Sequence, residues 1–251
     1  MTDTLRLGHH VNGTSTKNDI LRVPGGGLLV LDSAADLGFL TDYRAANPDA
    51  DILFRATFPN EQSLDDWRWK VDTLCDRADP VRHLLTGILT PWCESRQDSL
   101  DDMKRYGSHT RLAVDLLHQR GYTNVIGGSW STTKPNLSWW PDWLRVGGSA
   151  CDSYAKHEYA RSLSDLGGQY GYRQLWDATP AEHRRPIYIT EATFDNDAGG
   201  GWRAVGVSAF DYRMLMTAYL RDCWSALYIK NVFAFQTAAL DPKWDSFEYI
   251  G

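Results

Sequence analysis

The sequence predicts one α/β domain, a single (β/α)8 TIM barrel whose last helix is short or missing. Eight short β-rich runs recur along the 251 residues. Most are apolar throughout, which is typical of parallel strands buried on both faces. Amphipathic helical patterns fill several of the gaps between them. Strands alternating with helices in a chain of about 250 residues favour a closed barrel over the alternative, a doubly wound open sheet.

The eight expected strands are spaced along the whole chain. They cover residues 5–11, 27–33, 51–58, 84–92, 123–130, 146–154, 186–193 and 231–239. The sixth has the least strand-like composition, because it is rich in Gly and Ser. The seventh ends at Glu191, and a lone carboxylate at the end of a core strand is costly to bury unless it is paired.

Five segments have helical periodicity or plausible helical composition. They cover residues 34–46, 63–75, 99–120, 158–177 and 208–229. Ser63 with Asp66 resembles a capping box at the start of the second segment. Ser99 with Asp102 repeats that spacing at the start of the third, and Gly121 supplies its C-cap. The first and fifth connections between strands are short and leave room for little helix.

Composition limits the class of protein. No repeat, low-complexity linker or change of composition divides the chain, so we expect one domain over residues 1–251. The net charge is -6 without basic clusters, which argues against nucleic acid or an anionic membrane as partner. The mean hydropathy is -0.43, and no apolar run approaches the roughly 20 residues of a membrane span. We expect a monomer.

The N-terminus carries no basic segment followed by an apolar one, so no signal peptide is expected within this sequence. A cytoplasmic location fits the sequence as given, and an extracellular one fits if a leader has been removed. The four cysteines are far apart and form no CxxC pair, a poor spacing for a zinc site or redox motif. Buried thiols are the expectation, with one disulfide left open.

Tryptophan is unusually frequent, with 11 residues in the chain. Several fall in segments expected to be loops, where flat aromatic rings suit the apolar C–H faces of sugars. Trp130 and Trp202 are the expected stacking platforms. Residues 138–143, with the sequence SWWPDW, fit either a platform in the fifth loop or a packed helical turn. The Gly-rich residues 196–202 lack a phosphate-binding pattern and predict a loop beside the site.

The carboxyl ends of barrel strands face one shared pocket, where TIM-barrel enzymes hold their active sites. Polar, aromatic and acidic residues gather at or just beyond these predicted ends. They are His9, His10, Asp32, Arg55, Trp92, Cys93, Glu94, Ser129, Trp130, Asp152, Tyr154, His157, Glu191 and Gln236. The convergence predicts a site assembled from separate parts of the chain.

Two glutamates, Glu94 and Glu191, follow the fourth and seventh strands. Hydrolysis of a glycosidic bond needs two carboxyl groups, one protonated and one ionised, whose environments separate their pKa values. We expect Arg55 and Tyr154 to hold Glu191 ionised. The apolar residues just before Glu94 would raise the pKa of that carboxyl.

Three segments resemble the clan A glycoside hydrolases, which are retaining (β/α)8 enzymes. PIYITEAT (186–193) is similar to the nucleophile strand of that family, DSYAKHEY (152–159) to its sixth strand, and VFAFQT (232–237) to its eighth. The resemblance implies retaining hydrolysis of O-glycosidic bonds, with Glu94 as acid/base and Glu191 as nucleophile. It also implies an oligo- or polysaccharide substrate, in our interpretation a β-linked glycan, and neither metal nor organic cofactor.

A larger set is expected to bind the substrate. It comprises His10, Arg55, Trp92, Trp130, Tyr154, His157, Trp202 and Gln236. The chain departs from the family pattern at Cys93, where the family has the Asn that binds the sugar 2-hydroxyl. It also departs at Phe235 and Gln236, where the family commonly has Trp. These departures favour a rival, a carbohydrate-binding barrel without activity.

A second rival is a metal-dependent barrel hydrolase or isomerase, in which His9 and His10 would bind a metal together with Glu94 and His157. His9 and His10 are adjacent, so they point to opposite faces of a strand and only one can reach the pocket. Glu94 could instead be a solvated acid beside Arg96. In that case Asp98 or Asp152 would be the substitute catalytic acid.

Overall fold

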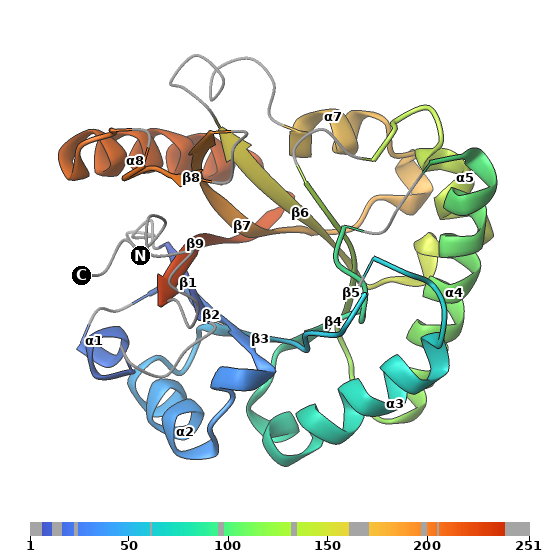
Figure 1. The fold of residues 1–251 in the computed structure, drawn as a ribbon, viewed down its shortest axis with the longest axis horizontal. Helices are drawn as coiled ribbons and strands as arrows, with labels where there is room; N and C mark the ends of the chain where they lie inside the picture. Colours follow the sequence, from blue (N-terminus) through green and yellow to red (C-terminus); the bar gives the residue numbers. More distant parts are fainter. Residues whose placement is uncertain are drawn as a thin grey trace.

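In the computed structural model, eight parallel strands close into a barrel within the part of the chain that is described, and helices lie outside it (Figure 1). The strand order around the barrel is β1 to β7 and then β9, which pairs with both β7 and β1. The structure describes residues 7–11, 17–22, 25–60, 62–94, 98–131, 135–160, 171–196, 200–204 and 206–238. The predicted barrel is confirmed.

The barrel strands are β1 (Gly8–Val11), β2 (Gly27–Leu31), β3 (Asp51–Arg55), β4 (Gly87–Leu89), β5 (Val125–Trp130), β6 (Ser153–Ala160), β7 (Ile187–Asn196) and β9 (Ile229–Ala238). A short β8 (Gly200–Gly201) pairs antiparallel with the end of β7. The helices are α1 (Lys17–Arg22), α2 (Leu37–Ala46), α3 (Trp67–Ala78), α4 (Leu100–Gln119), α5 (Trp140–Val146), α7 (Gly171–Asp177) and α8 (Ala209–Ser225). None of these is long and apolar enough to cross a membrane. The expected short or missing last helix falls in residues 239–251, outside the described residues.

Two helix starts were predicted from the spacing of Ser and Asp, and one is confirmed. Ser99 caps α4, because its hydroxyl accepts a hydrogen bond of 3.1 Å from the backbone N–H of Asp102. Gly121 follows the helix at φ +88°, the left-handed conformation that glycine tolerates best. The Ser63 prediction is wrong: its hydroxyl accepts from the N–H of Asp65 in a turn, and α3 begins later, at Trp67.

The sixth strand lies later in the chain than the sequence predicted. Residues 140–146 form α5, and the strand runs over Ser153–Ala160 instead of 146–154. The helix expected over 158–177 therefore starts within this strand, and among the described residues of that range α7 is helical. The error has a physical cause, because β6 carries charged residues that composition assigns to the surface.

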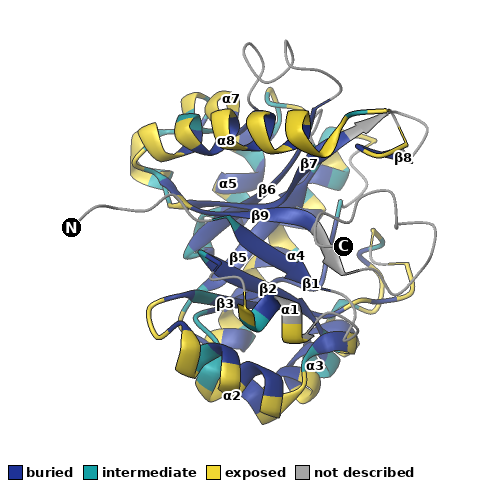
Figure 2. Cartoon of the chain, turned by 90° about the vertical axis from the view of Figure 1, so that its left-hand side faces the viewer, coloured by how far each residue is buried: buried dark blue, intermediate teal, exposed yellow. Residues whose placement is uncertain are grey.

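Strand residues alternate between two apolar layers, and most of the strand residues whose burial is described are buried (Figure 2). The barrel interior is filled by Leu29, Leu53, Leu89, Ile126, Ala155, Tyr188 and Phe233. The larger cluster lies between the strands and the helices. All four cysteines are buried thiols, as expected, and none forms a disulfide. Because the side-chain period of a strand is two, Arg55 and His157 also face the interior, above Leu53 and Ala155.

A buried pair of opposite charges lies on the outer face of β6. Lys156 and Glu158 are 1% and 7% exposed. Nζ of Lys156 donates to the carbonyl oxygens of Trp130 and His157, each at 3.2 Å. Glu158 accepts from the N–H of Gly171 at 3.3 Å. A Cβ at Gly171 would lie 2.8 Å from Cε of Lys156 and 3.0 Å from Oε1 of Glu158, so a larger residue there would displace the ends of both side chains.

Removing one charge of this pair should expose the cost of burying the other. Burial lowers the pKa of Lys156 to about 8 and raises the pKa of Glu158. Lys156→Met leaves Glu158 buried without its cation, and we expect a loss of about 3–5 kcal/mol in the free energy of unfolding at pH 8. The loss should be smaller at pH 5, because a carboxyl with a raised pKa takes up its proton at a higher pH than an ordinary one.

Urea denaturation at both pH values measures these losses. The matched control is the double variant Lys156→Met/Glu158→Gln, which keeps an acceptor for Gly171 and removes both charges. It should recover most of the stability at pH 8. Equal stability of the single and double variants at that pH would contradict the account.

Candidate active site

A bulge in β7 turns Glu191 into the barrel. Tyr188 faces the interior, so strict alternation would point residue 191 outward. The register shifts at Thr190, however: Lys156 pairs with Ile189, and the next residue of β6, His157, pairs with Glu191. One extra residue on β7 therefore reverses the alternation, a known way of re-aiming a side chain. This bulge explains how a carboxylate at the end of a core strand comes to face the pocket.

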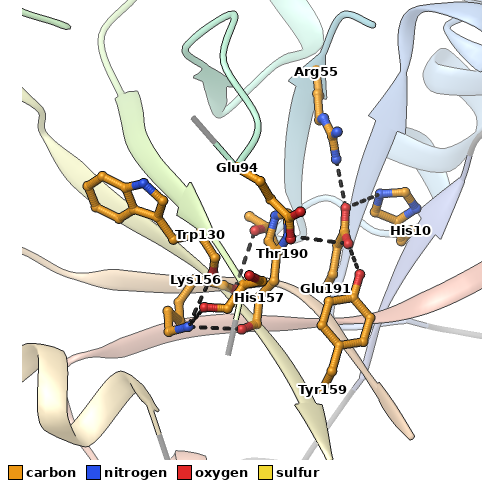
Figure 3. A network of polar contacts seen from close by, with 10 residues as sticks. His10, Arg55, Glu94, Trp130, Lys156, His157, Tyr159, Thr190 and Glu191 are labelled. Carbon is orange, nitrogen blue, oxygen red and sulfur yellow. Dashed lines mark hydrogen bonds and ion pairs between the residues drawn. The ribbon is translucent and has the colours of Figure 1, made fainter. Parts of the chain in front are cut away.

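Four side chains surround the carboxylate of Glu191, which is 6% exposed (Figure 3). Nη1 of Arg55 donates to Oε1 at 2.7 Å, and the hydroxyl of Tyr159 donates to Oε2. Nδ1 of His157 lies 3.4 Å from Oε2, and Nε2 of His10 lies 3.7 Å from Oε1. The partners come from β1, β3 and β6, so only the closed barrel assembles the group.

The surroundings of Glu191 keep it ionised. Burial would raise its pKa, but the positive charges of His157 and Arg55 outweigh that effect and lower the pKa to about 2. Burial and the charge of Glu191 raise the pKa of Tyr159 well above its usual value, so the phenol stays protonated and donates. Burial lowers the pKa of His10 to about 4, which leaves this ring neutral near pH 7.

Glu94 lies beyond β4 in a strained backbone conformation. Its φ is +50°, in the left-handed region that costs a residue with a side chain of the order of 1–3 kcal/mol. A hydrogen bond of 2.8 Å from its N–H to the carbonyl of Ser129 holds this conformation. The side chain is 34% exposed, and its Oε1 lies 3.5 Å from Nδ1 of His157. Glu94 is therefore the more exposed of the two glutamates, and Glu191 is the buried one.

The pKa of Glu94 is lowered from its ordinary value, chiefly because the His157 ring lies against its carboxylate. The expectation that its apolar neighbours would raise this pKa is wrong, because His157 outweighs the effect of burial. One nitrogen of His157 contacts both glutamates. Oε1 of Glu94 and Oε2 of Glu191 each lie within 3.5 Å of this nitrogen, so these two oxygens are at most twice that distance apart.

The sequence also missed a contact and misplaced one tyrosine. Tyr159, not Tyr154, holds Glu191. The hydroxyl of Tyr154 donates to the carbonyl of His183 at 2.7 Å, and the ring packs on Trp140 outside the barrel. The signal was the spacing of two from His157 to Tyr159, which puts both on one face of a strand. It was obscured because the strand was predicted to end at 154.

The tryptophans expected to stack on sugar are core residues instead. Trp130 is 0% exposed, with ring centroids 5.2 Å from Trp140 and 5.0 Å from Trp143. Trp92 is 1% exposed, and Trp202 is 5% exposed and stacks on a tyrosine of α8. None of the three presents an open ring face. Strand residues that point outward meet the helix layer, which large aromatic side chains fill. The segment 138–143 is accordingly a packed helical turn at the start of α5.

The remaining candidates divide between the pocket and the periphery. His10, Arg55 and His157 meet at Glu191, whereas His9 is buried on the opposite face of β1, against Gly25. Asp152 accepts from the N–H of Val125 and contacts His118, each at 2.8 Å, so it lies away from the pocket. The side chain of Gln236 and the whole of Arg96 lie outside the described residues. Asp98 is exposed.

One group of side chains in the described part has the spacing of metal ligands. Donor atoms of Cys93, His157 and Glu191 all lie within 4.8 Å of one another, and all three residues are buried. This group shares His157 with the set considered from the sequence, but it contains Cys93 and Glu191 in place of His9 and His10. Glu94 is not a member.

Several glycoside hydrolases of known structure are similar to this chain in fold. A family-128 (subgroup III) exo-β-1,3-glucanase from Blastomyces gilchristii, specific for curdlan and bound to glucose, superimposes with a TM-score of 0.59. The sequences are 10% identical, and the match covers 92% of this chain and 89% of that one. A family-51 α-L-arabinofuranosidase from Bifidobacterium longum gives the same TM-score at 10% identity, over 92% and 67% of the two chains.

An endo-β-1,6-glucanase superimposes with a TM-score of 0.55 at 10% identity over 91% of this chain. The chain spans 64% of the length of that enzyme. No protein-family model matches the sequence, and no curated protein matches it. At these identities the similarity establishes the barrel fold.

The strain at Glu94 leads to a stability prediction. Glu94→Gly and Glu94→Ala remove the same carboxylate, but only glycine adopts a positive φ without cost. We expect the free energy of unfolding of the glycine variant to be about 1 kcal/mol higher than that of the alanine variant. The difference is smaller than the full strain energy because glycine also raises the conformational entropy of the unfolded chain. Chemical denaturation of the two variants side by side measures the difference. Greater stability of the alanine variant would show that the backbone relaxes at this position.

Proposed function

We propose that the protein is a retaining glycoside hydrolase that acts on a glycan. The observation that carries this proposal is the arrangement of the two glutamates around one histidine. Glu191 is buried and ionised, held by Arg55 and Tyr159. Glu94 is partly exposed where a substrate would enter. A buried, ionised carboxylate and a second, more exposed carboxyl are the two groups that glycoside hydrolysis requires.

In the first step Glu191 attacks the anomeric carbon while Glu94 gives its proton to the departing glycosidic oxygen. The C–O bond of the substrate breaks, and an ester forms between the sugar and Glu191. In the second step Glu94, now ionised, takes a proton from water, and that water displaces Glu191 from the sugar. Retention requires carboxyl groups about 5–5.5 Å apart, and inversion about 6.5–9.5 Å. Contacts of 3.5 Å and 3.4 Å from Nδ1 of His157 to one oxygen of each glutamate place the two carboxyl groups close together, which supports the retaining assignment.

Coupling between the two carboxylates supports this exchange of roles. The His157 ring lowers the pKa of Glu94, but the negative charge of Glu191 acts in the opposite direction and favours the protonated acid before attack. Formation of the ester removes that charge, so the pKa of Glu94 falls and the same group becomes a base. Arg55 and Tyr159 stay in place as hydrogen-bond donors to the carboxyl oxygens.

The proposed substrate is a β-linked glycan, with β-glucans first. Two of the structural neighbours are named as β-1,3- and β-1,6-glucanases. This step rests on analogy of fold, so it needs a direct assay. Cys93, in place of the family's Asn, keeps a non-catalytic glycan-binding barrel as the second candidate. Binding of a glycan without turnover would favour that candidate.

Kinetics of glutamate variants test the assignment. On aryl glycosides and β-glucans, we expect Glu191→Gln to lose at least about 100-fold in kcat on every substrate, because the nucleophile is gone. Glu94→Gln should lose about 100-fold or more on β-glucans but less on aryl glycosides, whose leaving group needs no proton. Asp98→Asn serves as the control, since Asp98 is an exposed acid beyond the same strand. Unchanged turnover in Glu191→Gln would rule out the proposed nucleophile.

The pKa values predict an acidic optimum. The active form has Glu191 ionised, with a pKa of about 2, and Glu94 protonated, with a pKa below 4.5. Thus kcat/KM should rise as the pH increases past about 2 and fall as it passes the pKa of Glu94, giving a maximum below pH 4.5. His157→Ala removes the group that lowers both pKa values, so both limbs should move to higher pH.

Activity is measured after brief incubation at each pH. Each sample is then returned to one reference pH, where recovery of full activity distinguishes reversible titration from unfolding. His118→Ala is the matched control, because His118 is an exposed histidine paired with Asp152 outside the pocket. Its profile should coincide with that of the wild type. A falling limb that stays in place in His157→Ala would show that this ring does not set the pKa of Glu94.

A further inference from the structure

Three different metal-binding side chains meet in the candidate active site. Cys93 follows β4, His157 comes from β6 and Glu191 from β7, and they are 7%, 1% and 6% exposed. Their donor atoms lie within 4.8 Å of one another. The glycosidase chemistry proposed above has no use for the thiol.

A thiolate, an imidazole and a carboxylate are the three ligand types that zinc takes in proteins. Three protein ligands with one open position are also the usual number in an accessible zinc site. Ligand atoms around a tetrahedral zinc ion lie roughly 3.5 Å apart, given bond lengths of about 2.0–2.3 Å. The observed cluster would have to contract by about 1 Å, which small side-chain rotations supply.

The histidine of this cluster supplies a second, independent observation. Among the described residues neither ring nitrogen of His157 has a hydrogen-bond partner, although the ring is buried. Nδ1 points between two carboxylates, at 3.5 Å from Glu94 and 3.4 Å from Glu191. Without its proton this nitrogen offers a lone pair, and a bound cation would take the place of the proton between the two carboxylates.

The partners of Glu191 leave it able to bind a cation. Arg55 occupies Oε1 and Tyr159 occupies Oε2. Each carboxylate oxygen has two lone pairs, so one acceptor position remains on each. The charge of Arg55 opposes a cation, whereas a thiolate at Cys93 and the carboxylate of Glu94 attract one. The soft thiolate selects zinc over magnesium or calcium, which prefer oxygen ligands.

We propose that Cys93, His157 and Glu191 form a binding site for Zn²⁺. Binding releases the thiol proton to solvent and forms bonds from the ion to sulfur, nitrogen and oxygen. The ion then occupies the carboxylate that would attack the sugar, so zinc inhibits hydrolysis. The inhibition rests on the proposed function, whereas the binding rests on the cluster alone.

The test measures binding without reference to activity. Tag-free protein is titrated with Zn²⁺ against a chromogenic chelator, and separately with Co²⁺ as a spectroscopic substitute. We expect one zinc per chain at the site and a thiolate-to-cobalt charge-transfer absorption. Cys93→Ala should weaken zinc binding at least about tenfold and abolish that absorption. Cys75→Ala, which removes a thiol buried in α3, should change neither.

Two results would overturn the proposal: equal zinc affinity in Cys93→Ala and wild type, or no thiolate absorption in wild-type protein with cobalt. The second result needs no variant, so it decides the matter even if Cys93→Ala fails to fold. Zinc should also lower the rate of glycan hydrolysis by wild-type protein, and ethylenediaminetetraacetate should restore it. If the protein hydrolyses no glycan, the binding results still decide the zinc site, and the proposed function alone fails.

Discussion

The pairing of Arg55 with Glu191 across the barrel interior is the interaction on which the site depends. The guanidinium comes from β3 and the carboxylate from β7, and they meet at 2.7 Å with little exposure of either. Removing one partner of such a pair typically costs about 3–5 kcal/mol, because the other charge stays buried. The closed barrel makes the pairing possible, and the pairing in turn keeps an ionised carboxylate where apolar side chains would otherwise pack.

This arrangement gives one carboxylate two possible uses. Its lone pairs face a pocket that also holds His157 and Cys93, so an anomeric carbon and a thiophilic cation would compete for the same atoms. The positively charged and hydrogen-bonding side chains around Glu191 lower its pKa and keep it ionised. Both a sugar at the anomeric carbon and a metal cation require an ionised carboxylate. The proposed hydrolysis and the proposed zinc binding would therefore depend on the same electrostatics.

Much of the fold and part of the site could be predicted from the sequence. The apolar runs predicted the barrel, and the rule that strand ends share one face brought His10, Arg55, His157 and Glu191 together. The aromatic residues were the failure. Trp130 is equally compatible with a sugar platform and with a core, because a single sequence does not show which face of a strand meets the helices.

The sequence by itself determined the strand–helix alternation, since hydrophobic periodicity is a local property that does not depend on which elements pack together. Only the tertiary structure decided which side chains enter the pocket. The bulge at Thr190 reverses the facing of Glu191, and burial of Lys156 beside Glu158 lets a charged segment continue as a strand as far as Tyr159. Both features depend on partners elsewhere in the chain, on β6 for the bulge and on α7 for the charged pair. The face of a strand on which a side chain lies depends on the register of pairing, which the sequence alone does not give.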